Sequence, residues 1–117
     1  MSLLILTADL MFSSRAQMAA RSAGKKAHVA MSLPKAVELL AANEITTACV
    51  DLSAPGVDAA ATLTALREAA LLKPLRVIAY APHVHEAKLA AAVSAGYDAV
   101  LTRGQFDRSL MEIAAAS

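Results

Sequence analysis

Two patterns of apolar residues alternate along this chain: short continuous runs and stripes with helical spacing. This alternation limits the folds that the chain can adopt. Short runs that are mostly apolar recur at 3–7, 28–31, 46–50, 75–81 and 99–102. Runs that are apolar at successive positions are typical of parallel β-strands covered on both faces. The run at 28–31 is the weakest of the five, and we expect it to form an edge strand.

Segments with helical spacing lie between these runs. A first helix is expected from about 10 to 22, ending near Gly24, and Asp58 is a good N-cap for the third. Gly96 would end the fourth helix, and Asp107 lies near the start of the last one. The apolar stripes of the later segments are Leu33, Ala36, Val37, Leu40 and Ala41; Leu63, Leu66 and Ala70; Leu89, Ala92 and Val93; and Phe106, Leu110, Ile113 and Ala114.

Five strand-helix repeats predict an α/β fold with a five-stranded parallel sheet. Connections between parallel strands are right-handed, so the five helices should cover both faces of that sheet. The chain has 117 residues and shows no linker, internal repeat or low-complexity segment. We therefore expect one domain that spans residues 1–117.

Composition and charge argue against several classes of protein. The net charge is +1, which gives no basic patch of the kind that nucleic-acid binding needs. No segment has the roughly 18 apolar residues of a membrane helix, and the start of the chain lacks a signal peptide's basic region, so a cytoplasmic protein is expected. Cys49, the single cysteine, lies in an apolar run and should be buried and inert. Met11, Met18 and Met31 are expected to fill gaps in the core.

The residues that follow the strands are the candidates for a functional site, because open parallel sheets build their sites at the carboxyl ends of the strands. No glycine-rich phosphate loop follows the first strand, and no Ser-His-Asp or Cys-His pairing is suggested, so the chain is not expected to be an enzyme. The residues at these strand ends are Thr7, Ala8 and Asp9; Asp51, Leu52 and Ser53; Ala81, His83 and His85; and Thr102, Arg103 and Gly104.

Two of these segments resemble a known family. The run Asp-Leu-Ser-Ala-Pro-Gly-Val-Asp at 51–58 is similar to the segment around the phosphoacceptor of two-component response regulators. The run Ser-Ala-Gly-Tyr-Asp-Ala-Val-Leu-Thr-Arg at 94–103 is similar to the family's segment that ends in an invariant lysine. With the element order and spacing, the chain resembles a receiver domain over nearly its whole length. The resemblance implies a flavodoxin-like, CheY-like fold with strand order 2-1-3-4-5.

The resemblance also assigns roles to single positions. Asp51 matches the aspartate that accepts a phosphoryl group from a kinase histidine. Thr7 and Ala8 fall where the family keeps two acidic residues that help hold Mg²⁺. Ala81 falls where it keeps a Thr or Ser that hydrogen-bonds the phosphoryl group, and Arg103 where it keeps the lysine. Asp51 alone retains the family's residue, so the chain resembles a degenerate receiver, or pseudo-receiver.

Several roles for these residues are open on sequence grounds. Asp9 could supply one metal ligand, but capping the first helix is the simpler role. Asp51 could keep its phosphoacceptor role, accept hydrogen bonds from the turn amides before Pro55, or pair with Arg103. Mg²⁺ requires near-octahedral oxygen ligation, for which Asp9 and Asp51 are weak candidates, and no cofactor is expected. His83 and His85 lack an obvious third metal ligand and are expected to be exposed in a loop.

The function expected from the resemblance is that of a stand-alone signalling module that binds another protein. Phosphorylation by the usual Mg²⁺-dependent route is not expected. The alternative is a working receiver that is phosphorylated on Asp51 in a phosphorelay and uses Mg²⁺. A protein partner is expected, with a homodimer as one form of it, and neither nucleic acid nor a membrane. In receivers the fourth helix, fifth strand and fifth helix form the interaction face, which here comprises Lys88, Tyr97, Arg103, Phe106, Arg108 and Glu112.

Overall fold

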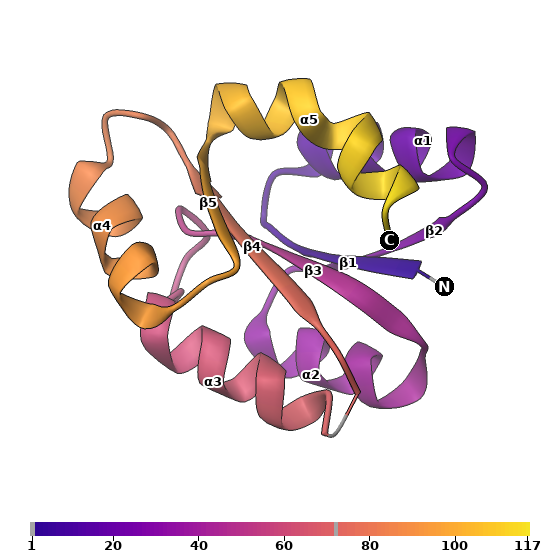
Figure 1. Cartoon of the computed structure of the whole chain (residues 1–117), viewed down its shortest axis with the longest axis horizontal. Coiled ribbons are helices and arrows are strands. Elements are labelled where there is room, and N and C mark those ends of the chain that lie inside the picture. Colours follow the sequence, from indigo (N-terminus) through magenta and orange to yellow (C-terminus); the bar gives the residue numbers. More distant parts are fainter. Residues whose placement is uncertain (1, 72) are drawn as a thin grey trace.

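The computed structural model describes residues 2–71 and 73–117. Strands and helices alternate along the chain, as the two alternating patterns of apolar residues predict (Figure 1). The strands are β1 (Ser2–Leu6), β2 (Lys26–Ala30), β3 (Ile45–Asp51), β4 (Arg76–Ala81) and β5 (Ala99–Thr102). The helices are α1 (Leu10–Ser22), α2 (Leu33–Ala42), α3 (Ala59–Ala69), α4 (Glu86–Ala95) and α5 (Arg103–Ala115).

All five strands are parallel and form one sheet in the order β2-β1-β3-β4-β5. This order confirms the prediction, including the placement of the weak second run at an edge. The two edge strands differ in character. β2 carries an exposed lysine, Lys26, at its start, whereas β5 is only four residues long.

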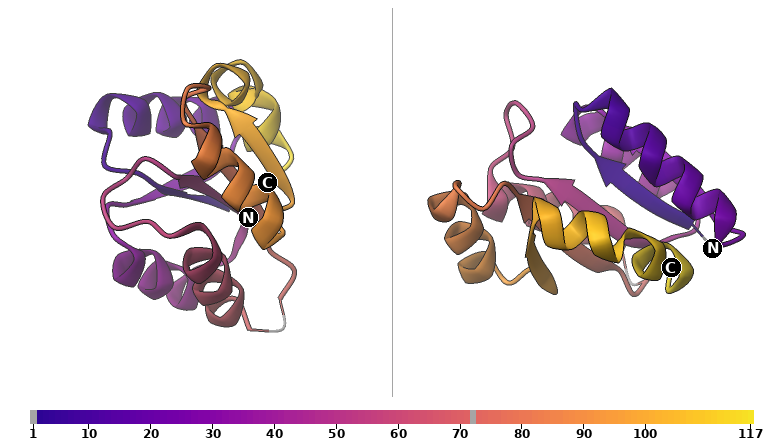
Figure 2. Two further views of the ribbon diagram at one scale, coloured as in Figure 1. Left: turned by 90° about the vertical axis from the view of Figure 1, so that its left-hand side faces the viewer. Right: turned by 90° about the horizontal axis from the view of Figure 1, so that it is seen from above.

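The sheet separates two hydrophobic clusters. On one face α1 and α5 pack against Leu3, Ile5, Cys49, Ile78 and Tyr80. On the other face α2, α3 and α4 cover the side chains that alternate with these along the strands. The two layers of helices stand apart on either side of the sheet in Figure 1 and in the left-hand view of Figure 2. Cys49 is buried in the first cluster, as predicted, and burial raises the pKa of its thiol to about 12.

Local capping explains where most helices begin. The side chains of Asp9 and Asp58 accept hydrogen bonds from the first turns of α1 and α3, which confirms Asp58 as an N-cap. Helix α5 begins at Arg103, directly after β5, so Asp107 lies inside it instead of near its start. Thr102 and Gln105 form a capping box that fixes this earlier beginning. Gly96 ends α4 in the left-handed conformation, with φ of +97°.

The prediction that Met11, Met18 and Met31 fill the core is wrong. Their exposed fractions are 82%, 66% and 57%. Alanines occupy the inner positions of α1 instead, because the small residues Ala16, Ala19 and Ala20 let that helix lie close to the sheet. Among the described residues, no helix is long and apolar enough to cross a membrane.

Candidate functional site

The strand ends that the sequence singles out meet at one edge of the sheet. Asp51 is the last residue of β3, and Thr7 follows β1, its neighbour in the sheet. Ala81 ends β4 on the other side of Asp51, and Arg103 opens α5. The Asp51 side chain is 7% exposed, so its carboxylate requires hydrogen-bond partners inside the protein.

Two protein groups supply these partners. The hydroxyl of Thr7 donates a hydrogen bond to Oδ2 of Asp51 over 2.7 Å. The backbone N–H of Ser53 donates to Oδ1 over 2.9 Å. The turn amide thus confirms one of the interpretations of Asp51, namely that it accepts a hydrogen bond from the turn before Pro55. Thr7 is the partner that the sequence did not reveal.

Asp9 caps helix α1 and also holds Arg103. Its Oδ1 accepts a hydrogen bond of 3.0 Å from the N–H of Phe12, and its Oδ2 lies 2.7 Å from Nη2 of Arg103. The hydrogen bond from Arg103, helped by the N–H of Phe12, lowers the pKa of Asp9. The same bond raises the pKa of Arg103. Capping was the simpler role expected for Asp9, and it is confirmed.

The partner of Arg103 is therefore Asp9, and the pairing with Asp51 suggested by the sequence is wrong. Both oxygens of Asp51 already hold protein donors, whereas Asp9 lies nearer to solvent. The Arg103 guanidinium also lies over the ring of Phe12, 5.0 Å from its centre, which fixes it on the side of α1. The side chain of Arg103 is 43% exposed, so this is a surface ion pair of small energy.

Thr7 connects the two carboxylates. Its oxygen accepts a hydrogen bond of 3.1 Å from the N–H of Asp9 while its proton goes to Asp51. A continuous chain of hydrogen bonds thus runs from Asp51 through Thr7 and Asp9 to Arg103. We call these four residues the edge network. In this arrangement the Thr7 hydroxyl donates its hydrogen bond to the Asp51 carboxylate, and the contact requires no added ion.

An aromatic cluster lies beneath the edge network. Tyr80 stacks on Phe106 with ring centres 4.1 Å apart and planes 3° apart, and Phe12 contacts both rings. Tyr80 is the register partner of Asp51 in the neighbouring strand, so its hydroxyl faces the Thr7 and Asp51 side chains. The Thr7 hydrogen bond goes to the carboxylate, and the buried Tyr80 hydroxyl has no hydrogen-bond partner among the described residues. Burial, with the charge of Asp51, raises the pKa of Tyr80.

No protein-family model matches the sequence, and no curated protein matches it. Solved structures do share the fold. A proposed response regulator from Chloroflexus aurantiacus has a TM-score of 0.78 at 21% identity, covering 99% of this chain and 98% of that one. A receiver domain from Bermanella marisrubri has a TM-score of 0.80 at 20% identity, with coverages of 95% and 92%. The receiver domain of a sensor histidine kinase from Pseudomonas aeruginosa, solved with Mg²⁺ in its cleft, has a TM-score of 0.75 at 14% identity, with coverages of 97% and 96%.

The chain has the receiver fold. The flavodoxin-like architecture and the strand order implied by the resemblance are thereby confirmed. At these identities the likeness extends to the fold and not to the chemistry, so the site must be judged from its own residues.

The residues at the edge of this receiver fold do not suit Mg²⁺. Ala8 offers a methyl group and the Thr7 hydroxyl is donated to Asp51, so neither supplies an anionic ligand. Each carboxylate oxygen of Asp9 and of Asp51 already accepts a hydrogen bond from the protein. No group of three or more His, Cys, Asp or Glu side chains within residues 2–71 and 73–117 could hold a metal.

The loop histidines take different positions. His83 is exposed, whereas His85 is half-buried at the start of α4, with Nδ1 3.2 Å from the hydroxyl of Ser53. The prediction that both histidines are exposed in a loop is confirmed for His83 and is wrong for His85. Ala81 is fully buried, and its methyl group joins the core below α4.

The predicted interaction face is only partly at the surface. Lys88, Arg108 and Glu112 are exposed, and Arg103 is held by Asp9. Phe106 and Tyr97 are buried, so they cannot contact a partner in this structure. Phe106 points into the aromatic cluster, and the Tyr97 hydroxyl donates a 2.8 Å hydrogen bond to the carbonyl of Ala59.

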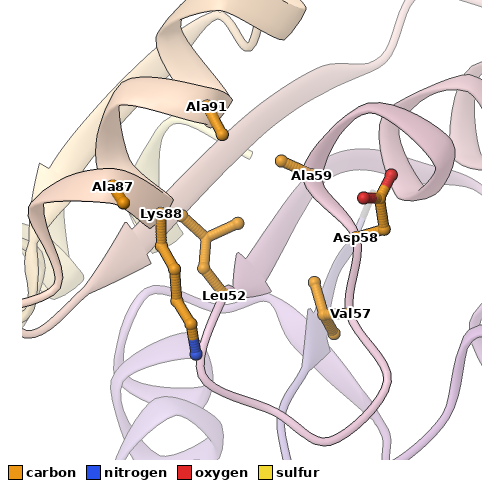
Figure 3. Close-up of a pocket in the computed structure, with 7 residues that line it drawn as sticks. All are labelled: Leu52, Val57, Asp58, Ala59, Ala87, Lys88 and Ala91. Atoms are coloured by element: carbon orange, nitrogen blue, oxygen red, sulfur yellow. The ribbon is translucent and has the colours of Figure 1, made fainter.

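A hollow of about 230 Å³ lies between the β3–α3 loop and α4 (Figure 3). The side chain of Lys88 extends beside Leu52, and the Asp58 carboxylate, on the opposite side, caps α3. The rest of the lining is apolar: Leu52, Val57, Ala59, Ala87 and Ala91. Among the residues that line this hollow, Asp58 and Lys88 are the charged ones.

Proposed function

We propose that residues 1–117 form a single degenerate receiver domain that acts as a protein-interaction module in signalling. In this proposal the domain is not phosphorylated by the Mg²⁺-dependent route, needs no cofactor and catalyses no reaction. The observation that carries it is the hydrogen bond from Thr7 to Asp51. It places a neutral donor against the carboxylate at the point where a metal-dependent receiver requires an anionic metal ligand.

The chemistry of phosphoryl transfer supports this proposal. Transfer to a carboxylate depends on positioning and on neutralising the charge of the phosphoryl oxygens. Here the positive charge of Arg103 is committed to Asp9, and Ala81 offers no hydroxyl. A phosphoryl group on Asp51 would therefore find neither a set of anionic metal ligands nor a free positive charge ready for its oxygens.

The partner in this proposal is another protein. With a net charge of +1, the chain has little electrostatic attraction for nucleic acid. Receiver folds without an active site can act only through their surfaces, and we propose that binding is the activity. We also propose a cytoplasmic location, in keeping with a single buried cysteine.

The alternative function is phosphorylation of Asp51. The retained aspartate at the end of β3 favours it, because that position is the chemical centre of sheets of this kind. It would require the Thr7 hydroxyl to turn away from Asp51 and Asp9 to leave Arg103, so that the two carboxylates could share a cation.

Incubation with acetyl phosphate and Mg²⁺, followed by intact mass measurement, distinguishes the two functions. We expect no phosphoryl adduct on the wild-type chain. The positive control is a variant with Thr7→Asp, Ala8→Asp, Ala81→Thr and Arg103→Lys, which restores the residue types implied by the resemblance. An adduct on the wild-type chain that is absent from Asp51→Asn would establish the alternative and overturn the proposal.

A further inference from the structure

Two hydrogen bonds join the walls of the hollow between the β3–α3 loop and α4. The Ser53 hydroxyl lies 3.2 Å from Nδ1 of His85, which ties the loop to the residue before α4. The Tyr97 hydroxyl donates its 2.8 Å hydrogen bond to the carbonyl of Ala59, which ties the chain after α4 to the start of α3. These bonds fix the separation of the two walls in the free protein. A preformed site binds without the loss of freedom that a flexible one would undergo.

The walls themselves are apolar and are built largely of small residues. Ala59 and Ala91 face each other from α3 and α4 in Figure 3, and their methyl groups leave space that longer side chains would fill. Leu52 and Val57 extend the apolar surface from the loop. The volume of about 230 Å³ is below the range of about 300–1,000 Å³ of most small-molecule pockets, and it suits one large side chain, such as that of phenylalanine.

The charges beside the hollow favour an acidic ligand. The Asp58 carboxylate is committed to the cap of α3, where it accepts a 2.9 Å hydrogen bond from the N–H of Ala61 and meets the positive end of the helix. Lys88 is exposed and forms no ion pair with any residue in 2–71 or 73–117. Glu86 is two positions away on α4, so the helix turns it to another side. The ammonium group of Lys88 is therefore the charge beside the hollow that is open to a ligand.

We propose that this hollow is a docking site for a linear segment of a partner protein, which inserts one large apolar side chain between α3 and α4 and places an adjacent acidic residue against Lys88. Burial of the apolar side chain against the alanine-lined walls supplies most of the affinity. The ion pair with the exposed Lys88 adds little affinity but sets the direction in which the segment lies.

The site differs from the interaction face that the resemblance implies. Its lining comes from the β3–α3 loop, the start of α3 and the outer side of α4, and Lys88 is the residue that the two surfaces share. The inference rests on the proposed function, because it names the chemistry of one partner of the interaction module.

Amide chemical shifts of the ¹⁵N-labelled chain, recorded during titration with short capped peptides, test the proposal. The probe is acetyl-Gly-Phe-Glu-Gly-amide, and we expect a Kd of about 1–10 mM with the largest shifts at residues 52–59 and 87–91. The peptide with Ala in place of Phe should produce no such shifts, because the buried ring is lost. The peptide with Gln in place of Glu should bind about two- to fivefold more weakly, as expected for loss of an exposed ion pair.

Variants of the chain locate the site on α4. Ala91→Leu, at an exposed position that lines the hollow, fills the space and should abolish the shifts caused by the Phe-Glu peptide. Ala90→Leu makes the same change at the preceding exposed position, outside the lining, and is the matched control that should bind as wild type does. Lys88→Met keeps an apolar stem without the charge, so it should bind the Glu and Gln peptides equally.

Other occupants of the hollow give different results. Undiminished binding by Ala91→Leu, or no shifts in the wild type at about 10 mM peptide, would overturn the proposal. Shifts of the same amides that grow with protein concentration alone would assign the hollow to a second copy of the chain, and equal affinity for phenylacetate would assign it to a small carboxylate. Each of these results is independent of acetyl phosphate, so failure of the docking site and failure of the proposed function are distinguishable.

Discussion

The hydroxyl of Thr7 lies 2.7 Å from Oδ2 of Asp51 and gives the carboxylate a neutral partner at the end of β1. The same oxygen accepts a hydrogen bond from the N–H of Asp9, so one small side chain bonds both the end of β3 and the residue that caps α1. A side chain in this position contributes to stability out of proportion to its size, because its loss leaves two polar groups without partners.

Removal of that hydroxyl should destabilise the fold. Thr7→Val keeps the shape but leaves the buried Asp51 oxygen without its donor, and we expect a loss of about 1–3 kcal/mol in the free energy of unfolding. Urea denaturation measures it. Thr7→Ser retains the hydroxyl and should lose only the methyl group's contribution, about 0.8 kcal/mol. Equal losses in the two variants would show that the hydrogen bond contributes nothing.

Restoration of acidic residues at the edge network should create a metal dependence that wild type lacks. In Thr7→Asp/Ala8→Asp, new carboxylates face the buried Asp51, so without divalent cations the variant should be less stable than wild type. Mg²⁺ should raise its melting temperature, because a cation that binds only the folded state stabilises it. Melting curves with Mg²⁺ and with EDTA measure the effect. A wild-type melting temperature that rises as much with Mg²⁺ would contradict the expectation that its edge network does not bind the cation.

The Asp9–Arg103 pair should make stability depend on pH in the acidic range. The pKa of Asp9 is lower in the folded protein than in the unfolded chain, chiefly because of Arg103. Its contribution is therefore present above about pH 4, the usual pKa of aspartate, and is lost as the pH falls through the lower folded value. The stability difference between wild type and Asp9→Asn should shrink over that interval.

Chemical denaturation of both proteins from pH 6 downward gives this difference directly. Asn is a good N-cap, so Asp9→Asn removes the charge without removing the cap of α1. A difference that stays constant with pH would mean that Arg103 does not favour the charged form of Asp9.

The two tyrosines should respond in opposite ways to loss of their hydroxyls. Tyr80→Phe removes a buried hydroxyl that has no partner among the described residues, so its stability should be unchanged or higher. Tyr97→Phe removes the hydrogen bond to Ala59 and should cost about 0.5–1.5 kcal/mol. Parallel denaturation curves compare them. A larger loss at Tyr80 would indicate that its hydroxyl has a partner in solution, such as a bound water molecule.

Much of the fold could be predicted because local patterns specify it. Consecutive apolar residues indicated the buried strands, and the capping carboxylates of Asp9 and Asp58 act within one turn of their own helices. The partner of Arg103 could not be predicted in this way, because Asp9 is 94 residues away and the choice between Asp9 and Asp51 depends on side-chain packing. Residue type was also a poor guide to burial. Methionines of α1 are exposed, whereas Phe106 and Tyr97 are buried, and the inner face of α1 is made of alanines and Phe12.

The two edges of the sheet bear on how molecules of this chain meet one another at high concentration. An exposed lysine on β2 and the shortness of β5 both disfavour the addition of a strand from another molecule. Growth of extended intermolecular sheets, the usual route to fibrous aggregates, has no good template on this surface. Crowded copies would thus have little tendency to join their sheets edge to edge.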